Sequence, residues 1–174
     1  MRDLVLKLSA AFGLLSRLSL YLSGLGLLLM TAAVSWQVFG RFVLNDSPTW
    51  TSNGSVMIMS WFILLGAAVG IREGNHLSFD VLLYLLGPSA KSLLHTISDI
   101  VVASFGFGMI LFGWRLAANN WNTTIPNIGI SGAWTYAALI WGGVLMVLFS
   151  TERVLRRAAG LKTARFGETD ILED

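Results

Sequence analysis

Four long apolar runs alternate with short polar stretches along the chain. They occupy about residues 18–40, 50–71, 90–114 and 133–151. At a rise of about 1.5 Å per residue, a helix of roughly 20 apolar residues crosses the hydrocarbon core of a bilayer, which is about 30 Å thick. The pattern therefore predicts an all-α integral membrane protein in which residues 1–157 form a single domain with four transmembrane helices.

A polar island at residues 71–80 separates the second apolar run from the third, and it contains Arg72, His76 and Asp80. The apolar segment that follows, residues 79–86, would rise only about 12 Å as a helix, which is too little to cross a membrane. Proline at position 88 disfavours helix at the residue before it. We therefore expect a short interfacial helix between spans two and three, with Asp80 in its first turn, where the helix dipole favours an acid.

The beginning of the chain has its own periodicity. Apolar residues recur there at spacings of three and four, at Leu4, Leu8, Ala11, Leu15 and Leu18. Such a stripe predicts an N-terminal amphipathic arm helix that lies in the membrane interface or packs on a partner, the alternative being that these residues simply begin the first span. The apolar run after Arg17 exceeds the roughly 7–15 residues of a signal peptide, so we expect it to remain as a mature span.

The basic residues orient the four spans. Ten of the twelve lysines and arginines lie in the N-terminal segment, the central loop and the tail, and the other two, Arg41 and Arg115, lie on the opposite side. By the positive-inside rule both termini are expected in the cytoplasm, as in a multi-pass protein of the bacterial inner membrane. Residues 158–174 combine mixed charge with low hydrophobicity, which predicts a disordered cytoplasmic tail.

Composition supports the membrane assignment and excludes several functions. Charged residues make up 13% of the chain and hydrophobic residues 55%, with a mean hydropathy of +0.68, whereas soluble domains carry about a quarter charged residues. The absence of cysteine excludes disulfides, thiolate metal sites and thiol catalysis. A net charge of +2 on so apolar a chain does not favour nucleic-acid binding.

Two ionisable side chains, His95 and Asp99, lie inside the third apolar run and share one helix face. An ionisable pair within a membrane suggests a functional site such as a proton relay, while a structural polar contact inside the bundle is the simpler interpretation. His76 and His95 also raise the alternative of a haem-binding anchor subunit of an oxidoreductase. Haem ligands need facing helix positions at matching depth, and His76 falls in a predicted loop.

Arg41 and Trp50 flank the first loop on the side with few basic residues. There they could contact a partner protein or anchor at the lipid headgroups. No metal-ligand cluster, phosphate-binding loop or nucleophile motif occurs, so we expect no enzyme activity and no cofactor in this chain. An autonomous small carrier stays an alternative, although carriers use broken helices and internal repeats around a midplane site, and neither pattern is visible.

Three landmarks, in order, resemble the small membrane subunit of tripartite ATP-independent periplasmic (TRAP) transporters of bacteria and archaea. They are Arg41-Phe42 with Asn45, Pro48 and Trp50; Arg72-Glu73-Gly74-Asn75-His76-Leu77 with Asp80; and Thr123-Thr124-Ile125-Pro126 with Ile128-Gly129-Ile130, Trp134 and Glu152-Arg153. The similarity extends from about Leu20 to Arg157. One departure is that Trp50 is followed by Thr51-Ser52-Asn53, where the family usually has an acid.

This resemblance implies a non-catalytic subunit that extends the static scaffold of a larger, elevator-type membrane subunit. The large subunit would hold the substrate and the sodium ions, and a soluble periplasmic binding protein would deliver an organic acid. By position, Arg41 and Trp50 would lie on the outer face where that protein docks. Arg72, His76 and Asp80 would mark the cytoplasmic turn.

Overall fold

The computed structural model describes residues 2–46, 48–74 and 88–161. This part of the chain folds into four α-helices, each long and apolar enough to cross a membrane. They are α1 (Arg2–Phe42), α2 (Thr49–Glu73), α4 (Pro88–Asn119) and α5 (Ala133–Ala158). The prediction of four apolar helices is confirmed. Each helix also extends beyond its predicted apolar run, because polar residues at the ends of a span can continue the helix outside the hydrocarbon core.

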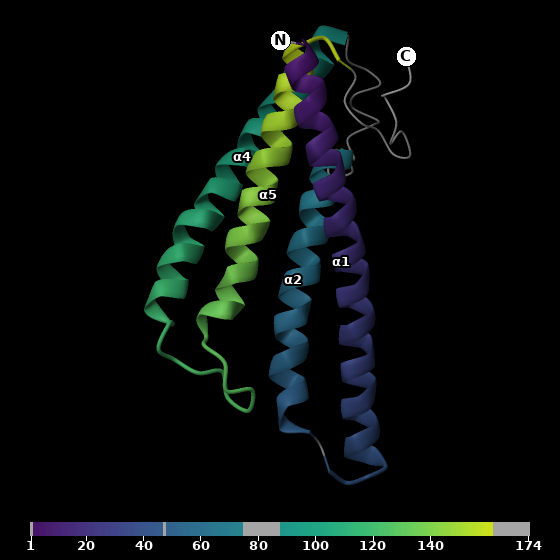
Figure 1. Cartoon of the computed structure of the whole chain (residues 1–174), viewed down its shortest axis with the longest axis vertical. Coiled ribbons are helices and arrows are strands. Elements are labelled where there is room, and N and C mark those ends of the chain that lie inside the picture. Colours follow the sequence, from purple (N-terminus) through teal and green to yellow (C-terminus); the bar gives the residue numbers. More distant parts are fainter. Residues whose placement is uncertain (1, 47, 75–87, 162–174) are drawn as a thin grey trace.

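The helices form two antiparallel hairpins, α1–α2 and α4–α5, which are joined by packing of α2 against α5. Figure 1 shows that the hairpins converge at the end of the bundle that holds the N-terminus and diverge toward the opposite end. We call these the N-terminal end and the loop end. The loop end carries the α1–α2 connection and the longer α4–α5 connection.

A separate N-terminal arm is not formed, and that prediction is wrong. Helix α1 continues unbroken for 41 residues, about 60 Å, because no proline interrupts it from Arg2 to Phe42. Among the side chains of α1 whose burial is described, the buried ones are serines, namely Ser9, Ser16 and Ser19, whereas Leu14 is 63% exposed. A soluble amphipathic helix buries its apolar side chains, and here the buried side chains are polar instead. In a bilayer the apolar face can contact lipid, while polar side chains find partners inside the protein.

The predicted interfacial helix at residues 79–86 and the side chains of His76 and Asp80 lie outside the described residues. So does most of the predicted tail, since the description ends at Leu161. Helix α5 extends through residue 158, so the first residue of the expected tail is helical.

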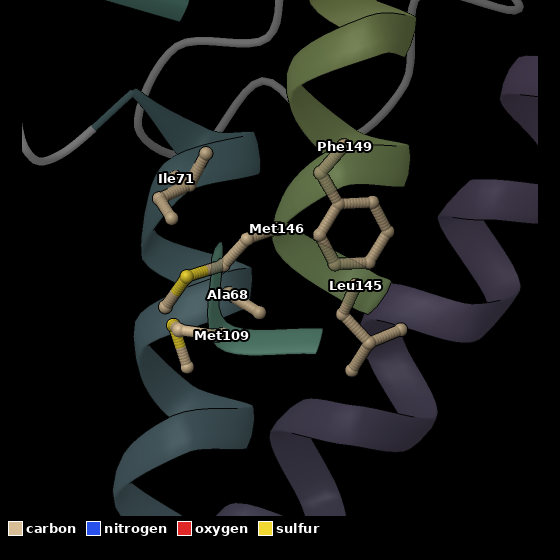
Figure 2. Packing of buried hydrophobic residues seen from close by; sticks show 6 residues of the cluster. All are labelled: Ala68, Ile71, Met109, Leu145, Met146 and Phe149. Atoms are coloured by element: carbon tan, nitrogen blue, oxygen red, sulfur yellow. The ribbon is translucent and has the colours of Figure 1, made fainter. Parts of the chain in front are cut away.

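The apolar core lies between α2, α4 and α5, toward the N-terminal end of the bundle. Figure 2 shows residues of three helices packed together. They are Ala68 and Ile71 of α2, Met109 of α4, and Leu145, Met146 and Phe149 of α5. Phe149 is completely buried. This three-helix contact is where the two hairpins are joined through apolar packing.

Helices α4 and α5 approach so closely that their backbones touch at a pair of glycines. A Cβ atom on Gly143 would lie 2.6 Å from the carbonyl oxygen of Gly106, and one on Gly106 would lie 2.9 Å from that of Gly143. Helix pairs in membranes gain van der Waals contact when small residues let the backbones meet. Glycine at both positions therefore sets the spacing of the α4–α5 hairpin.

Candidate functional site: a buried ionic cluster

Six charged side chains meet at the N-terminal end of the bundle, and we call them the ionic cluster. They are Arg72 of α2, Asp99 of α4, and Glu152, Arg153, Arg156 and Arg157 of α5. The four residues from α5 occupy one broad face of its last two turns, because positions three and four apart on a helix are neighbours. Residues of α1, α2 and α4 pack against that face.

Asp99 is fully buried and lies at the α4 side of the cluster. Nε of Arg153 donates to its Oδ1 atom at 3.1 Å, and Arg157 forms an ion pair with its Oδ2 atom. Arg157 also donates from Nη1 to the hydroxyl of Thr96, one turn before Asp99, at 2.8 Å. Two arginines of α5 thus hold one carboxylate of α4, which fixes the register of this hairpin.

Glu152 connects the other hairpin to α5. Its Oε2 atom accepts from Nε of Arg72 at 3.0 Å, and its Oε1 atom accepts from the Ser9 hydroxyl at 2.5 Å. Arg156, one turn further along α5, lies 3.6 Å from the same oxygen and donates to the Ser9 hydroxyl at 3.0 Å. Glu152 therefore joins α1, α2 and α5 at a single buried carboxylate.

Arg153 also caps the end of α2. Its Nη1 atom donates to the carbonyl oxygens of Ile71 at 3.1 Å and Arg72 at 3.2 Å. The last four carbonyls of a helix have no partner within the helix, so a buried helix end needs donors from elsewhere. One guanidinium thus reaches both the end of α2 and the Asp99 carboxylate on α4.

The energetics of the cluster follow from its burial. Within it, four guanidinium groups face two carboxylates. Taking these ions out of water costs several kcal/mol each, which close pairing and additional hydrogen bonds offset. Removing one buried partner leaves the others without compensation, at a cost of about 3–5 kcal/mol. The arrangement therefore specifies one packing of the four helix ends, rather than adding greatly to overall stability.

The structure brings some of the predicted site residues together and separates others. Asp99 and Arg72 are members of the ionic cluster, and His95 is half-buried one helical turn before Asp99. Arg41 and Trp50 lie at the loop end. There the guanidinium of Arg41 lies 5.8 Å from the centre of the Phe42 ring, and Trp50 is half-exposed. His76 and Asp80 are outside the described residues.

Sequence reasoning missed the α5 half of the cluster. It ended the fourth span at residue 151 and treated Arg153, Arg156 and Arg157 as orientation charges at the start of a tail. Their spacing after Glu152 was the available signal, since it places an acid and three bases on one face of a continuing helix. Only packing could show that this face meets Asp99.

Removing the Ser9 hydroxyl tests how α1 is attached. We expect Ser9→Ala to destabilise the chain by about 1 kcal/mol, because Glu152 and Arg156 both lose a hydrogen-bond partner. Thermal unfolding of the purified protein in detergent measures the effect. Ser35→Ala, at an exposed position of the same helix, is the matched control and should be neutral. Equal effects of the two changes would contradict a docked α1.

Among the described residues no group of three or more histidine or acidic side chains is placed to hold a metal ion. The four apolar helices and the buried ionic cluster that sets their packing define a small multi-pass membrane protein. A family model described as "Tripartite ATP-independent periplasmic transporters, DctQ component" matches residues 30–160. The chain belongs to this family, and it is a transporter component, not an enzyme.

Individual relatives agree with the family assignment. The chain is 28% identical to the sialic acid TRAP transporter small permease protein of Vibrio cholerae over 126 residues, 72% of each chain. It is 27% identical to a putative TRAP transporter small permease protein of Haemophilus influenzae over 129 residues, 74% of this chain and 80% of the relative. It is 24% identical to the C4-dicarboxylate TRAP transporter small permease protein of Pseudomonas aeruginosa over 144 residues, 78% of this chain and 66% of the relative.

Proposed function

We propose that this chain is the non-catalytic small membrane subunit of a sodium-coupled TRAP transporter and forms part of the static scaffold for a large elevator-type subunit. The observation that supports this role most directly is the ionic cluster. It ties α1, α2, α4 and α5 together at one end of the bundle. Displacing α2, α4 or α5 would separate buried charges at a cost of several kcal/mol. Displacing α1 would break the hydrogen bonds of Ser9. The bundle therefore resists deformation while a partner moves against it.

The same cluster argues against an autonomous carrier that works through Asp99. An intramembrane carboxylate that couples transport to an ion must exchange that ion during the cycle. Asp99 is instead fully buried between Arg153 and Arg157. Glu152 is likewise held by Arg72 and Arg156. We therefore propose that His95 and Asp99 serve the structure of the bundle.

The substrate class follows from the relatives. The names of two of them specify sialic acid and C4-dicarboxylates, both of which carry carboxylate groups. We propose that the assembled transporter imports an organic acid delivered by a periplasmic binding protein. Its sodium ions bind in the large permease and not in this chain.

The basic residues of the chain indicate how the bundle is oriented in the membrane. With the N-terminal end of the bundle in the cytoplasm, the positive-inside rule is obeyed, and both termini lie there. Arg72 then belongs to the cytoplasmic turn, together with His76 and Asp80. Arg41 and Trp50 lie on the periplasmic face, where the Arg41 guanidinium beside the Phe42 ring and the half-exposed Trp50 indole are available to the binding protein.

Reconstitution in liposomes distinguishes a scaffold subunit from an autonomous carrier. Proteoliposomes should be prepared with this chain alone, with the large permease alone, and with both, each supplied with the binding protein and a sodium gradient. We expect uptake of a radiolabelled organic acid only when both membrane subunits are present. Uptake by this chain alone would overturn the proposal, and so would full activity of the large permease without it.

A further inference from the structure

The connection between α4 and α5 is a built hairpin. The amide of Ile125 donates to the carbonyl of Ile130 at 2.8 Å, and that of Gly132 donates to Thr123 at 2.7 Å. At its tip Asn127 and Gly129 adopt left-handed backbone angles, with φ of 67° and 77°. Asparagine and glycine are the residues that accept this conformation at least cost. The connection at residues 120–132 therefore holds a defined shape.

The tip of this hairpin rests on the first turns of α2. The side-chain amide of Asn53 donates to the carbonyl of Pro126 at 2.9 Å, and that of Asn127 donates to the carbonyl of Thr49 at 3.4 Å. Between them Ile128 covers Gly54, where an added Cβ would lie 3.9 Å from the Ile128 Cδ1 atom. We call the two hydrogen bonds the latch. They join the two helical hairpins at the end where the helices diverge (Figure 1).

The chemistry of the latch depends on a donor at position 53. The acceptor is a carbonyl oxygen, so the side chain must offer an N–H or O–H group. An ionised carboxylate of nearly the same shape has no proton to donate and would place a negative charge against the carbonyl dipole. Asparagine and aspartate should therefore have opposite effects at this position.

We propose that the latch, with Asn53 as its positioning residue, holds the 120–132 hairpin on α2 and so sets the surface that the subunit presents at the loop end. Trp121 lies within this hairpin and Trp134 follows it in the first turn of α5, and both side chains are strongly exposed. This inference rests on the proposed function: the latch holds the loop-end surface in the shape that the periplasmic binding protein contacts. Without it, the hairpin would sample positions away from α2, and docking would require it to be ordered first.

A labelling experiment on the chain in nanodiscs tests the latch directly. The chain has no cysteine, so Ile128→Cys creates a single thiol, and its rate of reaction with a membrane-impermeant maleimide reports how often the tip leaves α2. In this background we expect Asn53→Asp to raise the rate about fivefold, the factor that one hydrogen bond contributes. Asn53→Ala, which removes the donor without adding charge, should raise the rate less.

The matched control is Ser52→Asp, which adds the same charge at the neighbouring exposed position outside the latch. It should leave the labelling rate unchanged. Equal rates for Asn53→Asp and the Ile128→Cys parent would overturn the latch. So would an increase of the same size in Ser52→Asp.

The complete transporter tests the positioning role. In proteoliposomes containing both membrane subunits, Asn53→Asp should raise the half-saturating concentration of the binding protein about fivefold and leave the maximal uptake rate unchanged. A general loss of stability would lower the maximal rate instead. An unchanged half-saturating concentration, or the same increase in Ser52→Asp, would overturn the positioning role. Failure of the unmodified complex to transport would contradict the proposed function, while the labelling result would still decide whether the latch exists.

Discussion

Replacing Asp99 with asparagine is expected to destabilise the purified chain by about 3–5 kcal/mol, the typical cost of removing one partner from a buried ion pair. The amide keeps the volume of the side chain but leaves Arg153 and Arg157 without their shared carboxylate. The loss should also weaken the capping of α2, since Arg153 reaches the Ile71 carbonyl from the same position. Denaturant unfolding in mixed micelles, followed by circular dichroism, measures the change in free energy.

Asp46→Asn is the matched control, because Asp46 is an exposed carboxylate in the α1–α2 connection. It should change the unfolding free energy by no more than about 0.5 kcal/mol, as expected for surface substitutions. A stability equal to wild type in Asp99→Asn would show that the buried pairing with Arg153 and Arg157 is absent. Transport distinguishes the roles further: properly folded Asp99→Asn subunits should still support uptake by the complete complex, whereas an ion-coupling carboxylate would be indispensable.

Adding one methyl group at Gly143 is the second change expected to have a large effect. The new Cβ atom would lie 2.6 Å from the Gly106 carbonyl and 3.0 Å from the Met109 Cβ atom. Neither group can move unless α4 and α5 separate, so we expect Gly143→Ala to cost about 1–3 kcal/mol through overpacking. The measurement is again unfolding in mixed micelles, supplemented by assembly with the large permease on size-exclusion chromatography.

Gly108→Ala provides the control on α4. A Cβ atom at Gly108 meets nothing within 4 Å, so the methyl group enters open space. Alanine also has the higher helix propensity, so this variant should be neutral or slightly stabilised. If both alanine variants had the same stability, the close α4–α5 contact at Gly106 and Gly143 would be contradicted.

The order and approximate extent of the helices could be predicted because each depends on local composition. A run of apolar residues between charged ends is sufficient for a span, since backbone groups in lipid must be paired within the segment. The positions at which the helices end were predicted less accurately. Residues 152–158 continue α5 despite their charge, because Asp99, Ser9 and Arg72 supply partners that no local pattern reveals.

Two members of the ionic cluster, Asp99 and Arg72, were among the candidate residues of the sequence, but their partners were not predicted. Asp99 stood out because an acid inside an apolar run requires a partner, and Arg72 stood out in the polar island. Arg153, Arg156 and Arg157 were assigned to topology, as basic residues after a span usually are. Glu152 entered only as part of the third family landmark, with no partner expected for it. The leucine stripe at the start of the chain was interpreted as a separate amphipathic arm, whereas these residues begin the continuous helix α1.

The amino-acid sequence alone determined that the chain belongs in a membrane, that it crosses as four helices, and that it resembles the small TRAP subunit. These properties depend on hydrophobicity and short motifs, which neighbouring residues specify. Tertiary structure decided which charges pair, which face of α1 is buried, and that the 120–132 hairpin reaches α2. Ser9 and Glu152 are separated by 143 residues yet share a hydrogen bond. Contacts of that kind depend on how finished helices pack, and no local pattern encodes them.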